Sequence, residues 1–114
     1  MNAAQPSSRY AGLDLLSTSV VLVDADGDIA YVNPAAESLL GVSGALLVGG
    51  AVAYLFERCP DLLAVIETVR TRRETLFEHE LDVAVNGHPP QRLGCGLSPR
   101  DDEPGGVVLE LRAV

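Results

Sequence analysis

Lysine is absent from this sequence, so all eight basic residues are arginines, and they are outnumbered by 16 acidic residues. The formal net charge of −8 repels phosphate backbones and anionic lipid. No apolar run reaches the roughly 20 residues that cross a bilayer, and the N-terminus lacks the basic-then-apolar order of a signal peptide. We therefore expect a cytoplasmic protein that binds neither nucleic acid nor a membrane.

Cysteine is also scarce, because only Cys59 and Cys95 occur, far apart and without a C-x-x-C partner. This spacing indicates neither a zinc site nor a disulfide framework, and we predict two reduced thiols in the core. A chain without lysine has no G-x-x-x-x-G-K phosphate loop. No spacing of cysteine, histidine and aspartate supports a hydrolase, so we expect no catalytic residue.

Three alternating carboxylates, Asp24, Asp26 and Asp28, resemble the opening of a calcium-binding loop. The pattern then fails, since the sixth position is Ile29 instead of glycine and the twelfth is Ala35 instead of glutamate. We predict a solvated hairpin turn here and no metal site.

The chain has the length and the 47% hydrophobic content of one globular domain. Residues 1–8 are small and polar, and we expect them to form a flexible leader. Apolar residues at helical spacing predict an N-terminal flanking helix over residues 9–18, followed by the domain core over residues 19–114.

The core begins with two β-prone runs, residues 20–23 and 29–32, around an Asp26-Gly27 hairpin turn. Asn33 and Pro34 then supply the cap and first turn of a helix that is predicted to end at Gly41.

Later segments change their periodicity. Glycines interrupt residues 42–57 and predict short helical turns, whereas residues 60–73 form an amphipathic helix. Alternating apolar residues then predict three strands, at residues 77–85, 93–97 and 107–113. The expected fold is α+β, with a five-stranded antiparallel sheet covered by helices on one face.

The first hairpin and the Asn33-Pro34-Ala35-Ala36-Glu37-Ser38-Leu39-Leu40-Gly41 segment resemble PAS domains. Residues 16–40, together with residues 106–111, are similar to the N-terminal sensory domain of nitrogen-regulation histidine kinases of the NtrB type. The resemblance implies a regulatory and dimerisation module within a dimeric, cytoplasmic two-component kinase. It also implies downstream kinase domains, a response regulator of transcription as the phosphorylation target, and control by a PII-type signal protein.

The chain itself lacks the H-E-x-x-N-P phosphoacceptor box of such kinases, so the module is expected to be non-catalytic. It also lacks the residues that hold cofactors in other PAS sensors. The helix at residues 60–73 has no histidine to bind haem, and Cys59 does not stand in the Asn-Cys-Arg-Phe context of flavin photosensors. We therefore expect no cofactor.

A second hypothesis is a PAS sensor of small molecules in another signalling protein. The polar residues that could line its interior are Tyr54, His79 and Arg92, with His79 on the apolar face of its predicted strand.

The predicted dimer interface combines the flanking helix with the outer face of the sheet. Tyr10, Leu13 and Leu16 give the helix more apolar surface than a short flanking segment buries on its own domain. The outer face is expected to carry small or apolar residues in its middle, namely Ala84, Gly94, Gly96 and Val108.

Overall fold

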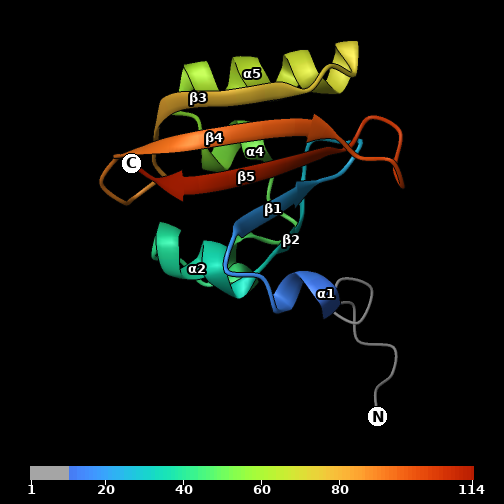
Figure 1. Cartoon of the computed structure of the whole chain (residues 1–114). Helices are drawn as coiled ribbons and strands as arrows, with labels where there is room; N and C mark the ends of the chain where they lie inside the picture. The colour runs from blue at the N-terminus through green and yellow to red at the C-terminus, as the bar shows by residue number, and fades with distance from the viewer. Residues whose placement is uncertain (1–10) are drawn as a thin grey trace.

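The computed structural model describes residues 11–114 and confirms the α+β architecture. A five-stranded antiparallel sheet has the order β2-β1-β5-β4-β3, so the first and last strands of the chain are neighbours in its centre. Figure 1 shows α5 running alongside β3, while α1 precedes β1 on the other side of the molecule. The elements are α1 (Ala11–Asp14), β1 (Ser19–Val23), β2 (Ile29–Val32), α2 (Pro34–Leu40), α3 (Gly44–Leu47), α4 (Val52–Leu55), α5 (Pro60–Arg72), β3 (Leu76–Val83), β4 (Gln91–Pro99) and β5 (Val107–Ala113).

One face of the sheet meets α2, α3, α4 and α5 in a continuous apolar core. Alternation along β4 and β5 turns every second residue inward, as the sequence predicts. The most deeply buried members from the sheet and the helices are Val21, Val23, Ile29, Leu47, Phe56, Leu62, Val69, Leu93, Cys95, Leu97, Val107, Leu109 and Leu111.

The first hairpin and α2 follow the local signals of the sequence. Gly27 closes the turn at φ 85°, which glycine adopts without strain. The Asp24 carboxylate accepts hydrogen bonds from the amides of Asp26 and Asp28, so its position in the turn is set by backbone donors. Asn33 caps α2, and Gly41 ends the helix in the left-handed conformation.

The longest helix, α5, also agrees with its predicted pattern. It starts at Pro60 and buries Leu62, Ile66 and Val69, which lie on one face. Across the described residues 11–114, no helix combines the length and apolar content needed to cross a bilayer.

Three local predictions are wrong. The flanking helix was expected to reach residue 18, but within the described residues it ends at Asp14. The strand predicted to continue to residue 85 ends at Val83. Ala84 is buried rather than on the outer face, because its backbone bonds to the sulfur of Cys59 under α5. The predicted leader, residues 1–8, lies outside the described residues.

Candidate functional site

Asn33 joins three elements through one fully buried side chain. Its Oδ1 accepts hydrogen bonds from the amides of Val20 (2.9 Å) and Ala36 (3.0 Å). Its Nδ2 donates to the carbonyl oxygens of Leu13 (3.1 Å) and Thr18 (2.8 Å). The side chain therefore fixes the end of α1 to the start of β1 and to the start of α2.

The flanking helix α1 lies on the outer face of the sheet, opposite the other helices. Leu13 packs against Val20, Leu22 and Tyr31, which form a second, smaller apolar cluster. The Tyr31 hydroxyl donates a hydrogen bond to the carboxylate of Asp14. Packing and polar contacts together hold α1 on its own domain.

The predicted interface residues of α1 have different environments. Tyr10 lies outside the described residues, and Leu13 is half-buried on its own sheet. Leu16 is 45% exposed, and its neighbour Leu15 is 88% exposed. The segment after α1 therefore presents two leucines to solvent beside the outer face.

Only one half of the outer face of the sheet is apolar. Gly94 and Gly96 lie there as predicted, and a Cβ at Gly96 would meet no atom within 4 Å. However, their partners across the β4–β5 ladder are Arg112 and Glu110, both exposed. The expectation of few large charges in the middle of this face is therefore wrong for its β4–β5 half. The apolar half consists of Val20, Leu22, Ala30, Tyr31 and Val108, on β1, β2 and β5.

The three predicted ligand residues do not meet at one site. Tyr54 is exposed on α4, and Arg92 lies on the outer face, where it forms ion pairs with Asp82 (3.3 Å) and Glu80 (3.9 Å). His79 pairs with the buried Cys95 across the β3–β4 ladder, so it lies on the core-facing side of β3, but its side chain is exposed. Ligand binding by these residues stays a prediction.

Both cysteines are free and buried, as the sequence predicts. Cys59 Sγ accepts from the Ala84 amide (3.1 Å) and donates to the Ala84 carbonyl oxygen (3.4 Å). Burial raises the pKa of the Cys95 thiol to about 11, because the core disfavours the thiolate. Both thiols pack in the main apolar core.

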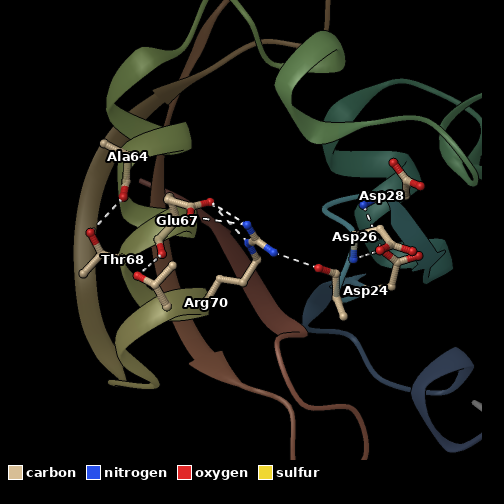
Figure 2. A network of polar contacts seen from close by, with 9 residues as sticks. Asp24, Asp26, Asp28, Ala64, Glu67, Thr68 and Arg70 are labelled. Carbon is tan, nitrogen blue, oxygen red and sulfur yellow. Dashed lines mark hydrogen bonds and ion pairs between the residues drawn. The ribbon is translucent and has the colours of Figure 1, made fainter.

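A polar network joins α5 to the β1–β2 turn (Figure 2). The Arg70 guanidinium donates to the carbonyl oxygen of Ala25 (2.7 Å) and forms an ion pair with Glu67 (3.1 Å). The amide of the same Ala25 donates to Glu103 Oε2 (2.7 Å), which comes from the β4–β5 loop. Ala25 is thus held by two charged side chains that are distant in sequence.

The β4–β5 loop is organised by a buried arginine. The Arg100 side chain is 1% exposed and binds the Asp102 carboxylate through two nitrogens, at 2.9 and 3.0 Å. It also lies 3.9 Å from Glu103 and donates to the Val23 carbonyl oxygen (3.5 Å). A Cβ at Gly106 would lie 2.9 Å from the backbone oxygen of Val23 and 3.1 Å from that of Glu103, so glycine is needed at that position.

The sequence pattern did not identify this network. Arg70 reads as an ordinary cation near a helix C-terminus, and the loop reads only as acidic and rich in proline and glycine. The available signal was a lone arginine in front of three carboxylates, in the run Arg100-Asp101-Asp102-Glu103.

Comparison of the chain with known proteins shows the family to which it belongs. A family model described as the PAS fold matches residues 8–114. The sensory histidine kinase/phosphatase NtrB of Rhizobium meliloti (strain 1021) is 31% identical over 105 residues, which are 87% of this chain and 26% of that protein. NtrB of Rhodobacter capsulatus is 27% identical over 109 residues, which are 96% of this chain and 30% of that protein. The chain therefore spans less than a third of these relatives.

A solved structure shows the same fold. The PAS domain of nitrogen regulation protein NR(II) from Vibrio parahaemolyticus matches with a TM-score of 0.74 at 24% identity, covering 93% of this chain and 97% of that one. The family resemblance seen in the first hairpin and the Asn33-capped helix is thereby confirmed over nearly the whole length. This chain belongs to the PAS-fold family.

Proposed function

We propose that this domain is the sensory and dimerisation module of a nitrogen-regulation histidine kinase of the NtrB type. The observation that carries the proposal is the flanking helix α1, which is fastened to the outer face of the sheet by Asn33 and Leu13. The kinship with NtrB proteins supports the signalling role. A module of this kind acts by changing how two copies are arranged, without chemistry of its own.

The proposed partner on the outer face is a second copy of the chain. Leu15 and Leu16 are exposed beside the apolar half of that face. An exposed apolar surface of this kind favours association, and a twofold dimer would let each copy cover the other's leucines. The two flanking helices would then lie together at the symmetry axis.

The parent protein is proposed to be a cytoplasmic kinase with its catalytic domains downstream of this module. Its phosphorylation target would be a response regulator of transcription, under control by a PII-type signal protein. The module itself would extend over residues 9–114, with residues 1–8 as a leader. The 31% identity to the Rhizobium meliloti NtrB, over an alignment that covers 87% of this chain, supports this assignment.

The dimer is tested by light scattering coupled to size exclusion at tens of micromolar protein. We expect the unmodified chain to elute with the mass of two copies. Leu16→Asp should raise the dissociation constant at least tenfold, since it would bury an unpaired charge in the interface. Circular dichroism should show that the variant stays folded, because Leu16 is outside the core.

Leu46→Asp is the matched control, because Leu46 is 75% exposed but lies on α3, away from the outer face. This control should remain dimeric. A monomeric unmodified chain, or equal losses in both variants, would contradict the proposed interface.

A further inference from the structure

The backbone of Ala25 is fixed by two charge-assisted hydrogen bonds, one on each side. Its carbonyl oxygen accepts from Arg70 on α5, and its amide donates to Glu103 in the β4–β5 loop, both at 2.7 Å. Bonds to ionised groups are stronger than bonds between neutral groups. Arg70 and Glu103, which are far apart in sequence, therefore both fix the position of Ala25 in the turn.

The loop side of this connection is tightly built. A Cβ at Gly105 would lie 3.2 Å from the Ala25 Cβ, so the loop backbone already touches the turn. Arg100 links Asp102 and Glu103 to the Val23 carbonyl oxygen at the end of β1. A displacement of the turn would therefore move the loop as well.

The loop in turn borders the flanking helix. Leu13 of α1 and the loop residues Arg100 and Asp102 line one hollow of about 390 Å³ on the outer face. A movement of the loop therefore changes the hollow that Leu13 of α1 borders.

At the other end of the connection, Arg70 is accessible from outside. Its side chain is 30% exposed and lines a hollow of about 350 Å³ between the turn, α4 and α5. Besides Arg70, its lining combines the carboxylates of Asp26 and Glu67 with apolar residues such as Leu63 and Ile66. Contacts made here could draw Arg70 away from Ala25.

We propose that Arg70, Ala25 and Glu103 form a latch that couples the α5 side of the domain to the flanking helix α1. The inference rests on the proposed regulatory function and names a route by which a signal reaches α1. With the latch closed, α5, the turn and the loop move as one body. With Arg70 withdrawn, the turn and the loop loosen, and α1 shifts on the sheet.

The first test is Arg70→Ala, followed by hydrogen exchange and amide NMR. The Ala25 amide bonds to Glu103 and not to Arg70, yet we expect its exchange to accelerate about tenfold when the other half of the latch is lost. The amide resonances of Leu13 and Asp14 should shift. Arg72→Ala is the matched control, because Arg72 is on the same helix but outside the network, and it should leave these signals unchanged.

The reverse test is Glu103→Ala, with Asp101→Ala as its control in the same loop. The Nε resonance of Arg70 should shift in the first variant and stay in place in the second. Changes confined to residues 24–28 and 67–71 in Arg70→Ala, or an unmoved Arg70 signal in Glu103→Ala, would show that there is no latch.

The same measurements in a Leu16→Asp background separate the latch from the dimer. The latch lies within one chain, so its signals should persist in a monomer. Loss of coupling in a chain that still dimerises overturns the latch alone, and a monomeric unmodified chain with intact coupling overturns the dimer alone.

Discussion

At the scale of single residues, Asn33 binds four backbone groups through one side chain. An amide has two donors and an acceptor oxygen with two lone pairs, and here every one of them is used. A carboxylate of the same shape could replace only the acceptors. The choice of asparagine therefore follows from the two carbonyl oxygens of Leu13 and Thr18.

Asn33→Ala should lower the free energy of unfolding by at least about 2 kcal/mol, because four buried or partly buried backbone groups lose their partner. Asn33→Asp should lose stability in a pH-dependent way. Burial facing two carbonyl oxygens raises the pKa of the introduced carboxyl, so its penalty is small in acid and grows as pH rises through that pKa. Urea denaturation at mildly acidic and mildly alkaline pH measures this. Equal losses for Asn33→Asp at both pH values would contradict the described environment.

Cys95 gives a second pH-dependent prediction. Its thiol is protonated in both states at neutral pH, but above about pH 9 the unfolded chain loses the proton while the folded chain keeps it until about pH 11. Stability should therefore fall across this interval by roughly 2–3 kcal/mol, since each pKa unit corresponds to about 1.4 kcal/mol. Cys95→Ala should lack this part of the decline in alkaline denaturation curves. Parallel curves would mean that the thiol ionises freely in the folded state.

At the scale of elements, α2 is bounded by two different devices, a side-chain cap at Asn33 and a left-handed glycine at Gly41. A Cβ at Gly41 would meet no atom within 4 Å, so any cost of a substitution comes from its φ of 72° and not from crowding. Caps of this kind set where a helix stops.

Gly41→Ala should lower stability by roughly 1–2 kcal/mol through backbone strain alone. Gly12→Ala is the comparison, because Gly12 has equal space around it but no left-handed backbone. Thermal unfolding of both variants distinguishes strain from a general effect of added methyl groups. A neutral Gly41→Ala would show that the end of α2 relaxes into another conformation.

Elements with strong local signals were predictable from the sequence, and those defined by distant contacts were not. The Asp26-Gly27 turn, the Asn33 cap and the apolar stripe of α5 depend on neighbours in sequence. His79 follows the alternating pattern of its strand and pairs with the buried Cys95, and only the three-dimensional structure shows that its side chain is exposed. Likewise, the network at Ala25 joins three segments that are distant in sequence, and none of its residues forms a recognisable sequence motif.

At the scale of the whole molecule, the net charge of −8 opposes the proposed association of two copies. The predicted contact surface is apolar, so added salt screens the repulsion between copies without weakening the contact itself. The dissociation constant should therefore fall several-fold between low and physiological ionic strength in sedimentation equilibrium. A dimer that weakens with salt would instead indicate an interface built on ion pairs, such as one over Glu110 and Arg112.

The central pairing of β1 with β5 also governs how the domain emerges during synthesis. All five residues of β1 are buried, yet the strand that pairs with them through Ser19–Leu111 and Val23–Val107 is made last. At roughly 5–20 residues per second, this apolar strand waits on the order of ten seconds for its partner. Until the last of the five strands is made, the newly synthesised chain carries an unpaired edge of β1, which exposes it to chaperones and to aggregation.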